Sequence, residues 1–346
     1  MKGNWSAAFQ IAAVYVGTVV GAGFATGREI VEFFSRYGFI GLVGMLMAGY
    51  MLIFLGTKIM VISAKIQANS YEEFNEYLFG KSLGKVINIL TLLMLLGVSA
   101  VMLAGAGAVF DEQLGMTKMF GIMLTIFLSY IVMLVGTKAL FAVNTFVVPL
   151  MIGFSLILFL LSIKQPNFIE QLLYIPYVKD GWSAVISPFS YTAFNLSLAQ
   201  AVLVPIASEV KDLKIIRRGG MIGGVALTVI LITSHTTLVT LPNFSSYEIP
   251  MAIIMRNLAP GLFWIYVLII YGEIFTSVIG NVYGLEKQIK QYTALPKMVI
   301  VTGIFLICYL LSLFDYSLLL SYLYPLFGYI SLLFVVLLWM KPENEK

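Results

Sequence analysis

Four glycines lie within one apolar run near the start of the chain, and their spacing indicates binding chemistry rather than covalent chemistry. They fall in the sequence VGTVVGAGFATGRE at residues 16–29, as Gly17, Gly21, Gly23 and Gly27. Glycine is a poor helix former, so a helix can open at such a run. The two helix ends created by an opening carry about half a unit charge each, positive at the new N-terminus and negative at the new C-terminus. We expect one end to hold a carboxylate and the other a cation.

The same glycines fit a second interpretation, in which they only allow two helices to pack closely. Gly17-xxx-Gly21 and Gly23-xxx-Gly27 both match the small-xxx-small pattern of membrane helices. Two features favour the opened helix: the glycines cluster at the middle of the apolar run, and the polar residues 28–29 follow directly. An open backbone inside a bilayer is tolerated where protein or trapped water satisfies it, which is typical of a binding site.

The composition is that of an integral membrane protein. The chain has 346 residues, of which 60% are hydrophobic and 11% are charged, with a mean hydropathy of +0.96. Soluble domains are about half apolar and a quarter charged. The single cysteine, Cys308, excludes an internal disulfide, and with the single histidine, His235, it argues against a cysteine- or histidine-based metal site. The net charge of +4 comes from basic residues in short loops, so we expect the lipid bilayer as a partner and no nucleic acid.

A membrane span needs about 20 apolar residues, and by that measure the sequence contains ten spans. Of the 21 lysines and arginines, fifteen fall on the side of the N-terminus and six on the other. This asymmetry predicts a multi-pass membrane protein with both termini cytoplasmic. The expected spans cover residues 6–35, 39–64, 84–112, 118–137, 141–163, 183–210, 215–240, 257–287, 297–313 and 316–340.

Three connections between the expected spans are longer than the others. Residues 67–85 have the pattern of a short cytoplasmic amphipathic helix. Residues 164–182 are expected outside, with a segment that lies at the membrane interface. Residues 241–256 contain two prolines and form an external loop that we expect to fold inward as a lid.

The sixth span, like the first, contains a segment that could interrupt its helix. Its sequence SPFSYTAFNLSLAQ, at 187–200, is too polar for a lipid-facing helix, and Pro188 and Pro205 each remove a backbone donor. The alternative is a kinked helix whose polar side chains are satisfied by neighbours. Interruptions in spans one and six of ten would make two halves of opposite topology, residues 5–163 and 183–340, and paired interruptions of this kind point to a transporter site.

Ten spans with interruptions in the first and sixth resemble the leucine-transporter (LeuT) fold of the amino acid–polyamine–organocation superfamily. The segment AAFQIAAVYVGTVVGAGFATGREI, at 7–30, is similar to the YkvI family of bacillar membrane permeases. The resemblance implies an all-α membrane protein of ten transmembrane helices, a single domain with a 5+5 inverted repeat and with helices 1 and 6 unwound. No defined substrate accompanies it.

The resemblance also implies a cation, which we expect to be sodium, between spans one and eight. Five oxygen ligands suit such a hard cation. Two of these ligands are the hydroxyls of Thr276 and Ser277, and the alternative for them is a bond to carbonyls one turn earlier in their own helix. A second sodium site looks absent because Phe24 stands where its asparagine would be, and span five lacks the lysine of some proton-coupled members. The implied ligands are the carbonyls of Gly17, Val20 and Glu273 and the hydroxyls of Thr276 and Ser277.

The implied solute site lies between the two interruptions, where backbone amides around Gly21 would hold a carboxylate. Span three is small and apolar at 103–107, where the family contributes an aromatic hydroxyl. The expected solute-binding residues are Gly21, Ala22, Gly23 and Phe24 from span one and Phe194, Asn195, Ser197 and Gln200 from span six.

Ionisable residues inside spans are functional candidates by default. Arg28 and Glu29, just outside the first break, are expected to form a gate pair, and the Glu273 side chain is a coupling candidate. His235 is expected to be a satisfied packing residue, and Lys58 is expected to reach the cytoplasmic surface along its apolar stem.

These features predict a sodium-coupled secondary transporter of a small organic solute, an amino acid or related zwitterion, working by alternating access. A proton-coupled or uncoupled permease of the same fold remains an alternative, as does a membrane sensor that binds the solute without moving it. A channel would need a continuous polar stripe, which spans two, four, five, nine and ten lack. An enzyme would need a convergent catalytic set, which one histidine and one cysteine in distant spans do not supply.

Overall fold

The computed structural model describes residues 2–135, 138–177, 181–210 and 212–342, and all regular structure in these ranges is helical. Each expected span corresponds to one helix or to consecutive helices. The first half of the chain forms α1 (Lys2–Val19), α2 (Ala22–Thr26), α3 (Arg28–Phe33), η1 (Ser35–Tyr37), α4 (Phe39–Met51), η2 (Leu52–Gly56), α5 (Thr57–Ile66), α6 (Tyr71–Phe79), α7 (Lys81–Ala108), η3 (Val109–Gln113), α8 (Lys118–Val135) and α9 (Lys138–Ser162).

The second half begins with a short helix and then repeats the pattern of long helices. It forms α10 (Phe168–Leu173), α11 (Gly181–Val210), α12 (Leu213–Leu238), η4 (Phe244–Ser246), α13 (Pro250–Leu258), η5 (Pro260–Leu262), α14 (Phe263–Tyr292), α15 (Lys297–Ser312) and α16 (Tyr316–Met340).

The long helices have the length and composition of membrane spans, so the chain is a multi-pass membrane protein. Within the described residues, six segments are long and apolar enough to cross a bilayer: Phe39–Ile66, Lys81–Gln113, Gly181–Val210, Leu213–Leu238, Pro260–Lys290 and Tyr316–Met340. Four shorter apolar helices accompany them: Trp5–Val19, Lys118–Leu134, Pro149–Ser162 and Lys297–Ser312.

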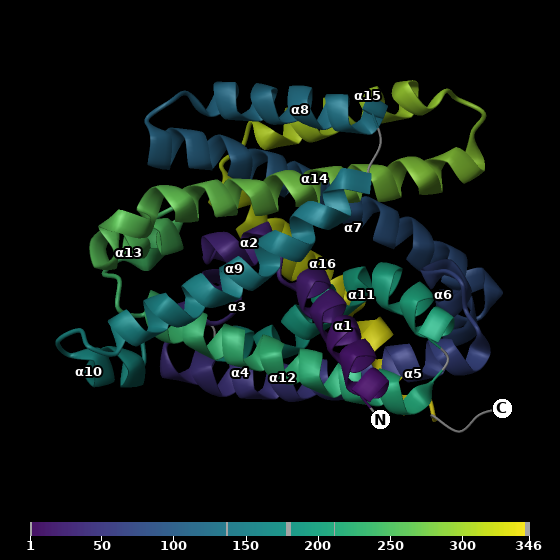
Figure 1. Ribbon diagram of the computed structural model, residues 1–346, viewed down its shortest axis with the longest axis horizontal. Helices are drawn as coiled ribbons and strands as arrows, with labels where there is room; N and C mark the ends of the chain where they lie inside the picture. The colour runs from purple at the N-terminus through teal and green to yellow at the C-terminus, as the bar shows by residue number, and fades with distance from the viewer. Residues whose placement is uncertain (1, 136–137, 178–180, 211, 343–346) are drawn as a thin grey trace.

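The helices form a bundle with α1 near its middle (Figure 1). α1 packs against α12, α11 against α16, and α7 against α14. Large side chains such as Tyr15, Tyr191 and Tyr266 are fully buried between them. Leucines and phenylalanines on the outer faces of α8, α14 and α15 are exposed, as expected of surfaces that contact lipid.

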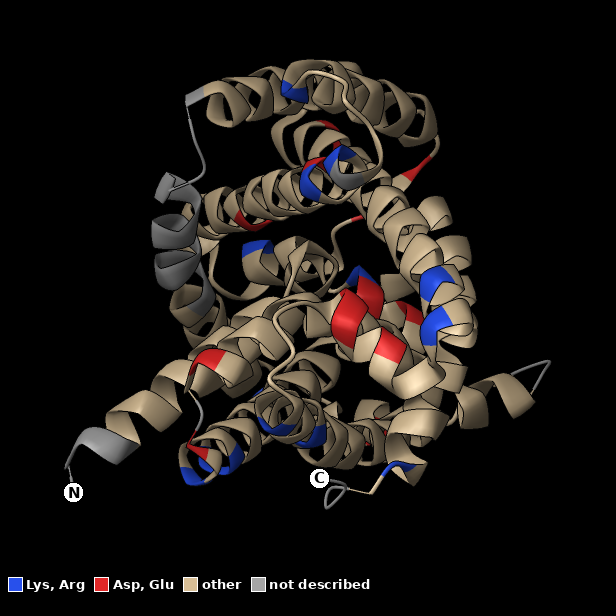
Figure 2. Ribbon diagram, turned by 90° about the vertical axis from the view of Figure 1, so that its right-hand side faces the viewer, with Lys and Arg blue, Asp and Glu red and all other residues tan. Residues whose placement is uncertain are grey.

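The short elements mark the two ends of the bundle. α10 and α13 lie at one end, and α6 lies at the other, toward which the described chain also runs at its C-terminus (Figure 1). Viewed from the α6 end, lysine and arginine positions surround the bundle (Figure 2). α6 is the helix expected within 67–85, and it begins at the N-cap Ser70, whose Oγ accepts from Glu73 N. A Glu73 carboxylate oxygen accepts from Asn69 N, one residue before the cap, at 2.8 Å.

Candidate functional site

The first span is interrupted at Gly21. The last bond of the α1 ladder runs from Val20 N to Val16 O at 2.8 Å, Gly21 is extended (φ −118°, ψ −170°), and α2 starts at the next residue. Phe24 N and Ala25 N both donate to Gly21 O at 3.0 Å. In the described chain no backbone amide donates to the carbonyl of Gly17 or Val20. The C-terminus of α1 therefore presents free carbonyls inside the protein.

A second turn, at Gly27, separates α2 from α3. Gly27 has a φ of +83°, a left-handed conformation that favours glycine. A Cβ at this position would lie 2.5 Å from Met251 Cγ of α13. The backbone conformation and the close approach of α13 thus both require glycine here.

Tyrosines from two distant helices hold α2 in place. Tyr266 of α14 donates its hydroxyl to Ala25 O at 3.1 Å. The Tyr316 hydroxyl of α16 lies 2.8 Å from Thr26 Oγ1. The five-residue helix is fully buried, so these contacts fix it between the α14 and α16 sides of the bundle.

The predicted unwinding of span six at Phe194–Ser197 is wrong for this structure, because α11 runs without interruption from Gly181 to Val210 and contains both prolines. Polar side chains bond back to carbonyls along the helix. Thr192 Oγ1 donates to Pro188 O at 2.8 Å, and Gln200 Nε2 donates to Ser197 O at 3.0 Å. Such bonds satisfy these two side chains within α11 itself. The helix is unbroken, as in the alternative interpretation, although that interpretation expected partners on neighbouring elements.

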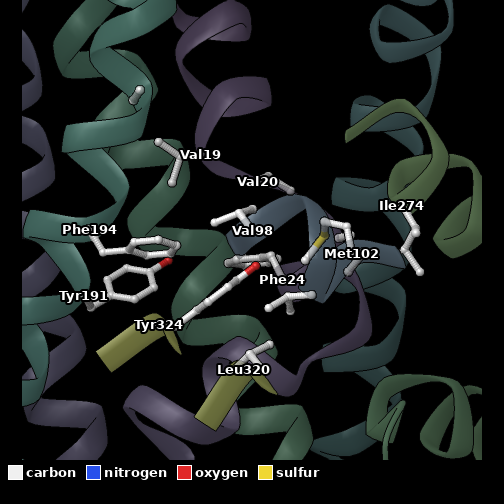
Figure 3. Packing of buried hydrophobic residues seen from close by; sticks show 14 of the residues in the cluster. Val19, Val20, Phe24, Val98, Met102, Tyr191, Phe194, Ile274, Leu320 and Tyr324 are labelled. Atoms are coloured by element: carbon white, nitrogen blue, oxygen red, sulfur yellow. The ribbon is translucent and has the colours of Figure 1, made fainter. Parts of the chain in front are cut away.

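The solute residues expected on α11 divide into two groups. Phe194 packs on Tyr324 of α16, with ring centroids 4.6 Å apart (Figure 3), and Asn195 contacts Glu29 of α3. Ser197 and Gln200 lie farther along α11, where both are buried and Gln200 Oε1 has no partner. The structure therefore places Asn195 beside α3 of the first span and Phe194 against α16.

Arg28 and Glu29 do not form the expected gate pair. The Arg28 Nη1 donates to Ser245 O at 2.6 Å and to Tyr247 O at 3.2 Å, in the loop before α13. Glu29 Oε1 instead accepts from Asn195 Nδ2 at 3.2 Å. Consecutive residues on a helix point about 100° apart, so the two side chains face different neighbours.

One of the expected cation ligands on α14, Ser277, lies beside the first break. A Cβ at Gly21 would be 4.0 Å from Ser277 Oγ, which places that hydroxyl close to the opened backbone. Thr276 Oγ1 donates to Glu273 O at 3.2 Å, so this hydroxyl makes the bond within its own helix that the alternative interpretation predicts. Among the described residues, no group of three or more His, Cys, Asp or Glu side chains is placed to hold a metal ion.

Three other polar residues in the spans are buried. The Glu273 side chain is 3% exposed, and its Oε2 has no hydrogen-bond partner. His235 Nδ1 lies 3.0 Å from Ser35 Oγ, whereas its buried Nε2 has no hydrogen-bond partner, so only one of the two ring nitrogens is satisfied. Lys58 is buried rather than at the surface, and its Nζ donates to Trp339 O, 2.9 Å away in the last turn of α16. A cation is stabilised at such a helix C-terminus.

Two glutamates that sequence reasoning missed fix the segment before α13. Glu112 accepts from Glu248 N at 3.2 Å and from Ile249 N at 2.7 Å, at the start of α13. Glu248 in turn accepts from Ser317 N at 2.7 Å in the first turn of α16. An acidic residue two positions before Pro250 was the available signal, because carboxylates favour helix N-termini. The segment folds inward as expected, with Met251 and Met255 buried.

The space beside the break is closed in this conformation. A cavity of about 10 Å³, room for about one water molecule, is bordered by Val20, Phe24, Ser155 and Tyr266. A larger outer hollow of about 580 Å³ lies at the α10 end of the bundle, bordered by Arg36, Gln171 and the loop at 243–246.

Comparison of sequences gives relatives over the full length of the chain. The chain is 49% identical over 349 aligned residues to the uncharacterized membrane protein YkvI of Bacillus subtilis (strain 168), covering 100% of this chain and 99% of that protein. It is 25% identical to the uncharacterized protein YyaD of the same organism, covering 99% of each. No family model matches the sequence.

Comparison of structures gives membrane transporters. A mutant of the Eremococcus coleocola manganese transporter matches with a TM-score of 0.66 and 14% identity, over 97% of this chain and 79% of that one. Mhp1 in an inward-facing conformation matches with a TM-score of 0.55 and 12% identity, over 88% of this chain and 69% of that one. The likeness shows that the fold is of the LeuT type. The relatives and neighbours are membrane proteins and transporters, not enzymes.

Proposed function

The chain belongs to the YkvI family of membrane proteins, and from this membership and the LeuT-type fold we propose that it is a secondary active transporter of a small organic solute. The observation that carries the proposal is the buried interruption of the first span at Gly21. Irregular backbone is tolerated at membrane depth where it lines a binding site or cavity. Transporters of this kind place their sites at broken helices near the bilayer midplane.

The pattern of helix contacts supports ten spans arranged as two inverted halves, with α1–α9 as the first and α11–α16 as the second. If α7 is matched to α14 and α8 to α15, the contact of α7 with α15 becomes that of α14 with α8, and both are present. Matching α9 to α16 likewise turns the contact of α9 with α14 into that of α16 with α7, which is also present. A pseudo-twofold axis between the halves requires that each such contact has a counterpart when the matched helices are interchanged.

We assign sodium to the position between the end of α1 and α14. The free carbonyls of Gly17 and Val20 lie at the negative end of α1, and Ser277 Oγ lies beside Gly21. These groups, with Thr276 Oγ1 and Glu273 O, make a neutral oxygen set that suits a monovalent ion better than calcium, whose sites usually include carboxylates. A proton-coupled permease is the competing assignment.

The solute is proposed to be an amino acid or related zwitterion held between α2 and α11. Ala22 N and Gly23 N begin α2 and have no helical carbonyl to bond. One structural neighbour is named as a manganese transporter. Here the groups around the break are carbonyls, hydroxyls and aromatic rings, and this set favours an organic solute over a transition metal.

We place both termini in the cytoplasm of a bacterial cell and the α10–α13 end outside. The lysine and arginine asymmetry supports this orientation. The external segment would then cover the closed site from outside, and rocking of α1–α5 and α11–α12 against the other helices would alternate access.

A two-step experiment tests the proposal. Thermal stability of the purified protein is measured against a panel of amino acids and osmolytes, with and without sodium, and each stabilising solute is then offered to proteoliposomes under an imposed sodium gradient. Uptake above protein-free vesicles supports the transporter. Stabilisation without any uptake or exchange would instead establish a ligand sensor.

A further inference from the structure

We propose that Glu29, which lies beside the ring pair of Tyr324 on α16 and Phe194 on α11, binds an ammonium group of the solute. This inference rests on the proposed function and narrows its substrate class, because it requires a solute with a positively charged nitrogen. It replaces the role in a gate pair that the sequence suggested for this residue.

The Glu29 carboxylate lies against the opened segment of the first span. A Cβ at Gly23 would be 2.7 Å from Glu29 Oε2 and 3.4 Å from Tyr324 Cε2. The absence of a side chain at Gly23 therefore lets the carboxylate and the tyrosine ring approach the same point of the α2 backbone. Glu29 Oε1 is held by Asn195, so the same carboxylate joins the first span to the sixth.

No cation of the described chain neutralises this carboxylate. Arg28 is bonded to carbonyls of the outer loop, and the nearest other arginine in sequence, Arg36, forms an ion pair with Glu32. Glu29 is 4% exposed. A buried carboxylate is costly unless it is paired, so this position favours a cation that arrives from outside the chain.

The rings near Glu29 provide the rest of an ammonium site. Tyr324 lies 4.6 Å from Phe194 between ring centroids, and Tyr191 packs on Phe33 of α3 with centroids 5.3 Å apart. Asn195, which holds Glu29, also donates to Tyr191 O at 3.1 Å. The Tyr191 hydroxyl is buried without a partner. Faces of aromatic rings attract organic cations. A proton alone would neutralise the carboxylate but would make no use of these rings, so the surroundings favour an ammonium group.

The experiment measures binding to the purified full-length protein by calorimetry. The probes are alanine, leucine and phenylalanine, each with the amine that lacks its carboxylate (ethylamine, isoamylamine, phenethylamine) and the acid that lacks its amine (propionate, 4-methylpentanoate, 3-phenylpropionate). We expect at least one amine to bind and its matched acid not to bind. Glu29→Gln should weaken the amine by at least about tenfold, the effect of losing a charged hydrogen-bond partner.

Matched variants separate this role from a general effect on folding. Glu32→Gln changes a neighbouring buried glutamate and should leave amine affinity unchanged. Tyr324→Phe should keep amine binding, whereas Tyr324→Leu should weaken it about fivefold or more, because only the second removes the ring. Should Glu29→Gln not fold, Gly23→Ala provides the second test, since its methyl group would occupy the space at Oε2.

Three results would overturn the inference: no probe with an ammonium group binds, the acids bind as well as the amines, or Glu29→Gln keeps full amine affinity and loses only a pH dependence. The last result would identify Glu29 as a proton carrier. Failure of the proposed function is separate, because amine binding without flux would leave the ammonium site intact and refute transport. Uptake of a solute without a positively charged nitrogen would support transport and refute the ammonium site.

Discussion

The two hydroxyl residues on α14 decide the proposed sodium dependence. Thr276→Val together with Ser277→Ala should raise the sodium concentration needed for half-maximal solute binding by at least about tenfold, equivalent to roughly 1.4 kcal/mol. The physical reason is that the ion loses two oxygen ligands while the solute groups stay in place. Solute affinity at saturating sodium should be nearly intact.

Thr302→Val is a suitable control for this double change. Thr302 is a hydroxyl residue of α15, and it bonds Tyr130 rather than any group at the break. If the solute affinity of the unmodified protein does not depend on sodium concentration but does depend on pH, the cation assignment is wrong.

Gly27 offers a separate test of the turn between α2 and α3. Gly27→Ala should destabilise the protein by about 1–3 kcal/mol, because a left-handed backbone is strained for alanine and the new methyl group would meet Met251. The measurement is the midpoint of thermal unfolding in detergent. Gly115→Ala is the matched control, with a φ of +65° and nothing within 4 Å of the added carbon. A loss no larger than that of the control would show that contact with α13 contributes nothing.

At the scale of elements, the external segment depends on carboxylates that accept from helix N-termini. Glu112→Gln should loosen the start of α13 and cost about 1 kcal/mol. Hydrogen exchange of the peptide covering 248–258 should rise in this variant. Glu170→Gln, at the start of the exposed helix α10, should leave that peptide unchanged. Equal exchange in both variants would mean that other contacts hold the segment.

Sequence reasoning predicted the elements better than the interruptions within them. The run at 16–29 opens where its glycines cluster: the chain leaves the helix at Gly21, which is extended, and it turns at Gly27, whose left-handed conformation favours glycine. Pro188 and Asn195 suggested a second opening, but α11 runs through both residues, and the Asn195 side chain bonds Tyr191 O one turn earlier in the same helix. Local composition cannot distinguish an interrupted helix from a continuous one, because the outcome depends on side-chain rotamers and on packing against distant elements.

The site was less predictable than the fold. The direction of Glu29, toward Asn195 and away from Arg28, follows from how α3 packs against α11, which lies 166 residues away in sequence. Glu112 and Glu248 were missed for the same reason, since each has its partner on a distant element.

At the scale of the whole molecule, the arrangement of the ends predicts topology. A reporter fused after Lys346 should be active only in the cytoplasm, and a cysteine placed at exposed Tyr177 in a Cys308→Ser background should react with an impermeant thiol reagent from outside. A cysteine at Asn69, near α6, is the control and should react only after the membrane is permeabilised. The opposite labelling pattern would invert the orientation.

Because the space at the first break is closed, the proposed transport cycle must take up water when that space opens. Ligand pockets typically enclose about 300 Å³ or more, whereas the cavity beside Phe24 has about 10 Å³. Opening it before the solute arrives would admit roughly ten water molecules at about 30 Å³ each. The balance between closed and open forms should therefore respond to osmotic stress, and a high concentration of an excluded polymer would hold the protein closed even when neither solute nor ion is present.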